Sequence, residues 1–267
     1  MPGRLEYKYL VPTALLEPIR AALRPHVSPD PLGGRERPGE YTVRSIYYDT
    51  LAFDCYHTKL AGLKVRNKFR IRGYNTPGLD PVVYLEIKKR NSGFIDKHRA
   101  PVLRRNLESL LSSRDIARYV IASKTMPAAH RDAERFLYHY VRFALHPAVL
   151  VVYDREAVMA RLDPSFRITY DTGLRRTLAP SLDDLYDDGR LAPAMGRTFI
   201  LELKFFRYAL PGWIRAVIAK FALPRMALSK YTICLDTNPS AALSAPGRGR
   251  RFARRLDPMT TERSLLC

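Results

Sequence analysis

The stretch KFRIRGYNTPGLDPVVYLEIKKR, residues 68–90, alternates charged and apolar side chains on either side of a short turn-forming segment. The charged members of the pattern are Arg70, Arg72, Glu86 and Lys88. The apolar members are Phe69, Ile71, Leu85 and Ile87. Because successive side chains of a strand point to opposite faces, each half predicts a strand with one charged and one apolar face. The connection NTPGLD, residues 75–80, is short and favours an antiparallel hairpin.

Strand-like segments of this kind dominate the chain. They are expected at residues 4–11, 41–48, 64–74, 81–90, 94–103, 148–161, 165–172 and 198–208. Helical patterns are expected between them, at residues 12–23, 112–122, 128–145 and 211–222. About eight strands are enough to close a barrel whose interior is filled by side chains or by one narrow ligand.

Charged side chains recur at a spacing of two in most of these strands, so they share one face of each strand. Besides the four above, these positions are Arg4, Glu6, Lys8, Lys97, Arg99, Arg155, Arg167, Asp171, Glu202 and Lys204. A half-exposed sheet with its charges in water explains any single strand. The helices also need an apolar surface to cover, and if they pack outside the sheet, the charged faces point into a barrel. A lumen lined in this way needs a polyanion, counterions or water to compensate its charge.

The residue types on the charged faces suit a ligand with repeated phosphate groups. Arginine offers a planar fork for two phosphate oxygens, and lysine offers a point charge. The few acids, Glu6, Glu86 and Glu202, have two interpretations. They pair with neighbouring bases as salt bridges, or they hold a hard divalent cation through oxygen ligands while substrate phosphates complete its shell.

The composition independently indicates a polyanionic partner. The chain has 267 residues, and 45 Lys and Arg against 26 Asp and Glu give a formal net charge of +19. A surplus of this size is typical of proteins that bind nucleic acid, an anionic membrane or a phosphate-rich ligand. Residues 238–267 are rich in Gly, Pro, Ser and Arg, and we expect them to form a disordered basic tail.

Cysteine content and the lack of long apolar runs predict a soluble cytoplasmic protein. Cys55, Cys234 and Cys267 are far apart and odd in number, which fits neither a disulfide framework nor a CxxC-type zinc site. No apolar run approaches the ~18 residues expected of a spanning helix. The start, MPGRLEYKYL, carries charge where a secretory signal needs an apolar stretch.

A series of motifs follows the chain in this order: RLEYKYLV, SIYYDT, KFRIRGY, YLEIKKR, DKHRAPV, VVYDREA, FRITYDT, FILELKFF and ALSKYTICLD. Together they resemble the VTC domain, the polyphosphate polymerase branch of the triphosphate tunnel metalloenzymes, a superfamily also called CYTH. The resemblance spans residues 4–236 and implies one tunnel domain over residues 1–237. It also implies an α+β fold, with helices packed outside an eight-stranded antiparallel β-barrel that forms the triphosphate tunnel.

Position by position, the resemblance assigns roles to residues of the charged faces. It implies catalytic contacts with the triphosphate for Lys8, Arg70, Arg72 and Lys230. It implies substrate binding for Lys88, Lys97, Arg99, Tyr153, Arg155, Arg167, Lys204 and Ser229. Glu202 resembles the family's metal ligand, commonly for Mn²⁺ or Mg²⁺, and Glu6 and Glu86 are the further metal candidates.

The resemblance implies an enzyme that moves the terminal phosphoryl group of ATP onto a growing inorganic polyphosphate chain. Many tunnel enzymes open with Glu-x-Glu-x-Lys, whereas this chain has Arg4-x-Glu6-x-Lys8. The missing glutamate fits the polymerase branch and argues against the thiamine-triphosphatase, RNA-triphosphatase and adenylate-cyclase branches. Two alternatives stay open: a metal-dependent tri- or polyphosphatase in which water attacks, and a non-enzymatic polyphosphate or polyanion binder.

The expected ligands are ATP and inorganic polyphosphate rather than a specific nucleic acid. The alternation directs the basic side chains into the predicted lumen, where a nucleic-acid duplex would not reach them. Eukaryotic polymerase complexes of this family add a phosphate-sensing domain and transmembrane helices, and neither is present in this sequence. Coupling to a membrane would therefore need a separate partner protein.

Overall fold

The computed structural model describes residues 5–31, 38–75, 81–91, 94–206 and 209–237. Its strands are β1 Leu5–Pro12, β2 Val27–Pro29, β3 Glu40–Asp49, β4 Arg66–Tyr74, β5 Val82–Asn91, β6 Phe94–Leu103, β7 His146–Ala160, β8 Asp163–Leu178, β9 Ala192–Pro193 and β10 Thr198–Phe205. Its α-helices are α1 Leu16–Leu23, α2 Asp54–Leu60, α3 Leu107–Ser113, α4 Ile116–Tyr119, α5 Ala129–Arg142, α6 Gly212–Lys220 and α7 Lys230–Asp236. The predicted tail, residues 238–267, and Arg4 lie outside the described residues.

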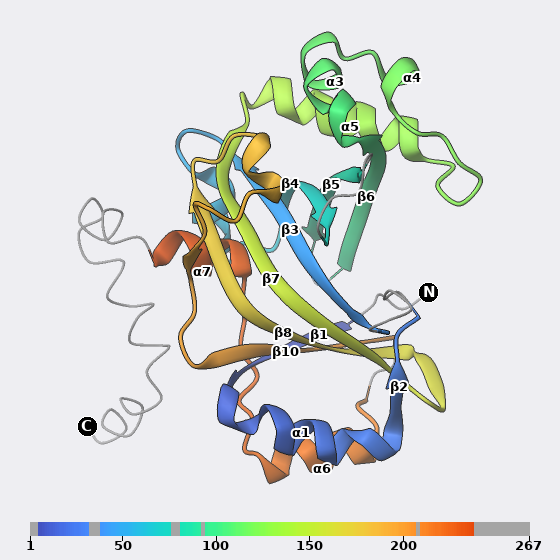
Figure 1. Cartoon of the computed structure of the whole chain (residues 1–267), viewed down its shortest axis with the longest axis vertical. Coiled ribbons are helices and arrows are strands. Elements are labelled where there is room, and N and C mark those ends of the chain that lie inside the picture. Colours follow the sequence, from blue (N-terminus) through green and yellow to red (C-terminus); the bar gives the residue numbers. More distant parts are fainter. Residues whose placement is uncertain (1–4, 32–37, 76–80, 92–93, 207–208, 238–267) are drawn as a thin grey trace.

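One antiparallel sheet organises the protein (Figure 1). Its main strand order is β1-β10-β8-β7-β3-β4-β5-β6, and β2 pairs with β7 while β9 pairs with β8. The long strands predicted from alternation are therefore confirmed. The sequence did not predict β2 and β9, which have three and two residues and are too short to show an alternating pattern.

The predicted closure into an eight-stranded barrel is wrong, because the described residues form a ten-stranded sheet in which the end strands β1 and β6 do not pair with each other. Other segments bond to these outer strands. Met226 N–H donates to the Lys8 carbonyl of β1 at 2.8 Å, and Ile121 N–H donates to the Pro101 carbonyl of β6 at 2.9 Å. Natural sheets often cover exposed edges with other segments. The result is a curled open sheet with one concave face.

The helix predictions are confirmed at α1, α5 and α6, whereas the single helix predicted at 112–122 is wrong. Two short helices, α3 and α4, stand near this position. Arg114 ends α3 with a left-handed φ of 60°, and the Asp115 side chain then accepts the Arg118 N–H to begin α4. Within the described residues, no helix has the length and apolar content needed to cross a membrane.

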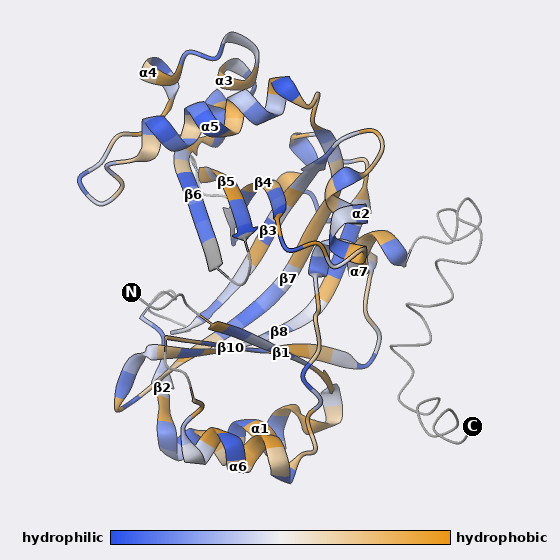
Figure 2. Ribbon diagram, turned by 180° about the vertical axis from the view of Figure 1, so that it is seen from behind, coloured by the Kyte–Doolittle hydropathy of each residue, from blue (hydrophilic) through white to orange (hydrophobic). Residues whose placement is uncertain are grey.

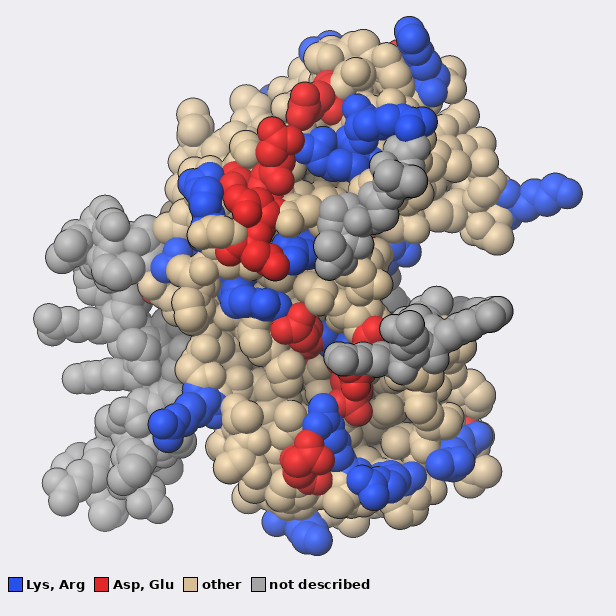
Figure 3. All heavy atoms as spheres, viewed as in Figure 1, with Lys and Arg blue, Asp and Glu red and all other residues tan. Residues whose placement is uncertain are grey.

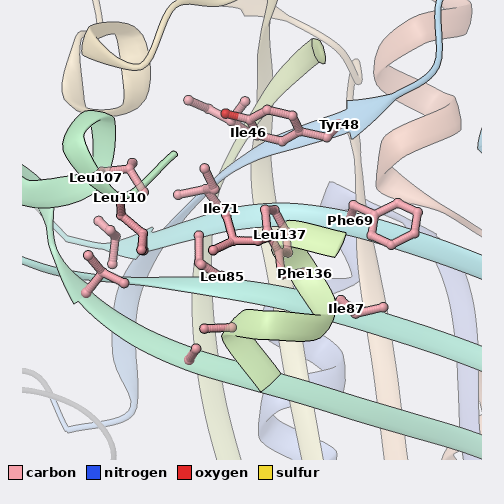
Figure 4. Packing of buried hydrophobic residues seen from close by; sticks show 14 of the residues in the cluster. Ile46, Tyr48, Phe69, Ile71, Leu85, Ile87, Leu107, Leu110, Phe136 and Leu137 are labelled. Atoms are coloured by element: carbon pink, nitrogen blue, oxygen red, sulfur yellow. The ribbon is translucent and has the colours of Figure 1, made fainter. Parts of the chain in front are cut away.

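The apolar face of one half of the sheet is covered by α3 and α5, as Figure 4 shows in close view. Phe69 and Ile71 of β4 and Leu85 of β5 lie in one buried cluster with Phe136 and Leu137 of α5. Each large side chain buried in this way stabilises the fold by about 1.5–3 kcal/mol. Figure 2 shows that α5 carries both hydrophobic and hydrophilic residues, of which Phe136 and Leu137 are buried and Glu134 is exposed.

The apolar face of the other half is covered by α1 and α6, which lie together below β1 and β10 (Figure 1). Ile19 of α1 and Ile214 of α6 are fully buried in a cluster with Tyr9 of β1 and Leu201 of β10. These helices pack on the side of the sheet opposite the charged face, as predicted. The charged face is therefore left to the concave side.

Helix α7 contradicts the prediction that all helices pack outside. Its Tyr231, Ile233 and Cys234 share a buried cluster with Val151 of β7 and Tyr47 of β3. Val151 alternates with Leu150 and Val152, which belong to the outer cluster under α5. Helix α7 therefore packs on the concave face itself and fills part of one end of it.

Asp49 fixes this position of α7. Its buried carboxylate accepts the Tyr231 hydroxyl of α7 at 2.5 Å and the backbone N–H groups of Thr50, Cys55 and Tyr56 at 2.8, 2.9 and 3.0 Å. The same carboxylate thus ties α7 to the start of α2. Both helices depend on one acceptor that the end of β3 supplies.

Replacing Asp49 by Ala should destabilise the protein by about 2–4 kcal/mol, because several buried donors lose their acceptor together. The free energy of unfolding, measured by denaturant titration, checks this expectation. The control is Glu134→Ala on the exposed side of α5, which should change stability by less than about 0.5 kcal/mol. Equal stability of the two variants would show that α7 is held by its apolar contacts alone.

Candidate functional site

The charged faces of the long strands lie together on the concave side of the sheet, as their parity predicted. The register places Lys8 opposite Glu202 and Arg70 opposite Glu86. The predicted site residues that the strands bring to this face are Glu6, Lys8, Arg70, Arg72, Glu86, Lys88, Lys97, Arg99, Tyr153, Arg155, Arg167, Glu202 and Lys204. Ser229 and Lys230 join them from the start of α7. The roles of these residues in binding or catalysis stay predictions.

Glu202 of β10 is the centre of one group of charges. Its carboxylate lies 3.1 Å from Lys8 Nζ, 2.5 Å from Lys204 Nζ and 3.4 Å from an Arg155 terminal nitrogen. Burial works to raise the pKa of Glu202, but Lys204, Lys8, Lys230 and Arg155 hold it well below its usual range. Glu202 is therefore ionised, with its charge directed at the concave side. Burial in turn lowers the pKa of Lys204 to about 8.

Asp171 of β8 forms a second centre beside the first. Arg155 donates to both of its oxygens, at 2.6 and 2.8 Å, and Lys230 Nζ lies 2.5 Å from one of them. The Tyr153 ring lies 5.2 Å from the Arg155 guanidinium carbon and 4.5 Å from Lys230 Nζ. Two bases are thereby fixed by one acid and one aromatic ring. Alternation placed Asp171 on this face, but no sequence pattern indicated that Asp171 orients Arg155 and Lys230.

Glu86 of β5 is a third centre and has no measurable exposure to solvent. One of its oxygens contacts Arg70, at 2.7 Å to Nε and 2.6 Å to a terminal nitrogen, and the other lies 3.1 Å from both Lys97 and Arg99. Burial opposes ionisation, but Arg70, Arg72, Lys97 and Arg99 hold the pKa of Glu86 far below its usual range. Glu86 therefore orders four basic side chains on β4 and β6.

An ion pair between side chains crosses the open side of the sheet, from β5 to β1. Lys88 Nζ of β5 lies 3.0 Å from a Glu6 oxygen of β1, although these strands are not hydrogen-bonded to each other. Lys8 and Lys204 lie 3.9 Å from the other Glu6 oxygen. Glu6 therefore connects the Glu202 group to the far wall. The concave face is enclosed by an ion pair where the backbone does not close it.

A polar pocket of about 360 Å³ opens beside these centres. It is lined by Arg20, Glu40, Tyr41, Thr42, Asn75, Asp154, Arg155, Glu156 and Thr172. Arg155 belongs to this pocket and to the Asp171 group, so the pocket borders the charged centres. Close by, Arg167 donates to the Tyr41 hydroxyl at 2.9 Å and pairs with buried Asp30 at 2.6 Å. Asp30 precedes β3 with no pattern around it, and the sequence did not identify it.

The donor set limits how a divalent cation fits this face. Among the described residues, no three His, Cys, Asp or Glu side chains group as metal ligands. Glu202 and Glu6 share Lys8 and Lys204 as neighbours, and one or two carboxylates plus substrate phosphates form a common Mg²⁺ site. These two residues fit a phosphate-bound cation. Glu86 fits less well, because four bases already surround its two oxygens.

The face of the molecule shown in Figure 3 carries a mixture of acidic and basic side chains. In Figure 3, Asp and Glu side chains form a band across the visible face, with Lys and Arg on both sides of it. On the concave face the predicted site bases outnumber the acids, so that single carboxylates such as Glu202 and Glu86 each contact several bases. A ligand with many negative charges is therefore attracted to the concave face rather than to the surface shown in Figure 3.

Comparisons with known proteins identify one family. A family model described as the VTC domain matches residues 3–237. No curated protein matches the chain significantly. Among solved structures, a putative adenylyl cyclase from Hippeastrum, described as having a dominant triphosphatase activity, is similar with a TM-score of 0.45 and 11% sequence identity. That similarity covers 87% of this chain and 95% of the other.

Proposed function

This chain belongs to the VTC domain family, and we propose that it transfers the terminal phosphoryl group of ATP to the end of an inorganic polyphosphate chain. Family membership supports an enzyme that acts on polyphosphate, by phosphoryl transfer or by triphosphate hydrolysis. The more specific proposal, transfer of the phosphoryl group to polyphosphate, rests on the arrangement of charged residues on the concave face.

The observation that carries the proposal is the group of bases around buried Glu202 and Asp171. Lys8, Arg155 and Lys230 each already contact one of these carboxylates. Their positions are therefore fixed before a ligand arrives. Phosphoryl transfer depends mainly on such fixed positions and on neutralising charge, and it needs little covalent chemistry from the protein.

In this mechanism, Arg70 and Arg72 hold the phosphates of ATP, and Lys8 and Lys230 neutralise charge at the transferred group. A terminal oxygen of the polyphosphate acceptor attacks the γ-phosphorus. A bond forms between this oxygen and phosphorus, and the bond from the γ-phosphorus to the bridging oxygen of ADP breaks. A divalent cation, Mn²⁺ or Mg²⁺, bound by Glu202 and Glu6 would supply further neutralisation of phosphate oxygens. The acceptor is already ionised, so no protein base is required.

With ATP and Mn²⁺, we expect the polyphosphate chain to gain one phosphate, through one new phosphoanhydride bond, for each ADP formed. Little free orthophosphate should appear. Product polyphosphate is measured after gel separation, and orthophosphate and ADP are measured in the same samples. Chelation of the metal by EDTA should stop both reactions. Orthophosphate equal to ADP would instead identify a triphosphatase, and no turnover of ATP with intact polyphosphate binding would identify a binding protein.

A further inference from the structure

Lys68 differs in its partners from the bases that were predicted for the site on the concave face. Lys68 lies two residues before Arg70 on β4 and pairs with Lys88 of β5 in the strand register. Within the described parts of the chain, no carboxylate lies within ion-pair distance of its ammonium group. Its hydrogen bond goes to the Ser229 hydroxyl, at 2.7 Å. Every base that was predicted for the site and lies among the described residues has an acidic partner.

The surroundings of Lys68 are basic. Burial lowers the pKa of Lys68 well below its usual range, and Lys8, Lys88, Arg70 and Lys59 lower it further. Because these four cations are near Lys68 and none of the described carboxylates is within ion-pair distance, a charged Lys68 destabilises the unliganded fold. An anion bound here would relieve this repulsion and restore the proton to Lys68.

Ser229 places a fixed hydroxyl group next to the Lys68 ammonium group. It is buried, and its hydroxyl oxygen accepts the Thr232 N–H at the start of α7 as well as the Lys68 ammonium group. Lys59 of α2 holds the preceding turn by donating to the Ala227 carbonyl at 3.2 Å. None of the described residues accepts the Ser229 hydroxyl hydrogen. This hydrogen remains available to an oxygen of a ligand.

Lys8 connects this position to the Glu202 group. Lys8 Nζ lies 3.1 Å from Glu202 and 3.4 Å from the carbonyl of Leu228, the residue before Ser229. Lys8 therefore lies between the Glu202 group, where the proposed mechanism neutralises the transferred phosphate, and the position beside Lys68. Two neighbouring phosphate groups match this arrangement, because phosphoryl transfer brings a donor and an acceptor phosphate together.

We propose that Lys68 and Ser229, together with Lys8, form a separate subsite for a phosphate group of the acceptor. The occupant is either the end of a polyphosphate chain or a single orthophosphate that starts one. This inference rests on the proposed function, in which the donor phosphates lie at Arg70 and Arg72. It adds a residue that neither motif spacing nor family resemblance identified.

Calorimetric binding without turnover tests this subsite, with Lys68→Met compared against Lys64→Met. Lys64 is exposed before β4, so its replacement removes the same charge outside the site. Lys68→Met should weaken tripolyphosphate binding roughly 10- to 100-fold, the range expected for a lost hydrogen bond to a charged group, while Lys64→Met stays within about twofold. ATP binding should change much less in both variants. Separate titrations with orthophosphate show whether a single phosphate suffices or a chain is required.

Three further readouts separate a ligand subsite from a structural role. Lys68→Met should be at least as stable as the unmodified protein without ligand, because a repelled cation is removed. It should take up fewer protons than Lys64→Met on binding tripolyphosphate, measured in two buffers of different ionisation enthalpy. Lys68→Arg should keep most of the affinity. Equal tripolyphosphate affinity of Lys68→Met and Lys64→Met, or an equal loss for ATP, would overturn the subsite. Absence of ATP turnover in the unmodified protein would overturn only the proposed function.

Discussion

Glu202→Gln should lower the turnover of ATP by about 10²–10³-fold while tripolyphosphate binding remains measurable. The glutamine keeps the size of the side chain but removes the charge that would hold a divalent cation, and a loss of this size follows removal of one preorganised electrostatic group. Binding should survive because Arg70, Arg72 and the lysines supply most of the attraction. The measurements are steady-state turnover with Mn²⁺ and calorimetric titration with tripolyphosphate.

The same substitution should also lower stability. Without the Glu202 charge, Lys8, Lys204 and Arg155 lose a buried anionic partner, and removing one member of a buried ion pair typically costs about 3–5 kcal/mol. Tripolyphosphate should recover much of this loss, so activity is compared at temperatures where each variant is folded. Glu134→Gln on α5 serves as the matched control. A fully active Glu202→Gln enzyme would mean that the metal is bound elsewhere.

Strand parity allowed the charged face to be predicted because a strand fixes side-chain direction locally. Arg70 and Arg72 lie on the same face as Glu86 for that reason. The same rule applied equally to Lys68, which the prediction overlooked although it belongs to the quoted stretch. Its importance depends on the absence of an acidic neighbour, and that is a property of several strands together.

Features that depend on contacts between distant segments could not be predicted in this way. The Lys88–Glu6 ion pair joins two strands that are not hydrogen-bonded to each other. The edges of β1 and β6 are instead bonded by the backbone N–H groups of Met226 and Ile121, which lie far from these strands in the sequence or outside them. The inward position of α7 had no signal either. Its apolar side chains fit packing outside the sheet as well as inside, and the choice is made by the Tyr231–Asp49 hydrogen bond and the neighbouring core.

Arg70→Lys and Arg72→Lys should each lower turnover by about 10²–10³-fold, although the net charge does not change. Arg70 donates to both Glu86 and the Tyr47 hydroxyl, at 2.7 and 2.9 Å, and one ammonium group on a flexible stem cannot reproduce this planar geometry. Arg72 donates through Nε to Ser45 at 3.0 Å. Among the described residues, nothing hydrogen-bonds to its two terminal nitrogens. They are free to engage two oxygens of one phosphate.

The central claim is that the ordered bases of the concave face, rather than the overall positive charge, perform the chemistry. The most direct test is ATP turnover by Arg70→Lys and Arg72→Lys beside a chain shortened to residues 1–237, which loses the Arg-rich segment. A generic polyanion binder responds to net charge and counterion release, so the shortened chain should then be the most impaired. The concave-face account predicts the opposite order, with both lysine variants nearly inactive and the shortened chain close to full turnover. Active lysine variants and an inactive shortened chain would contradict it.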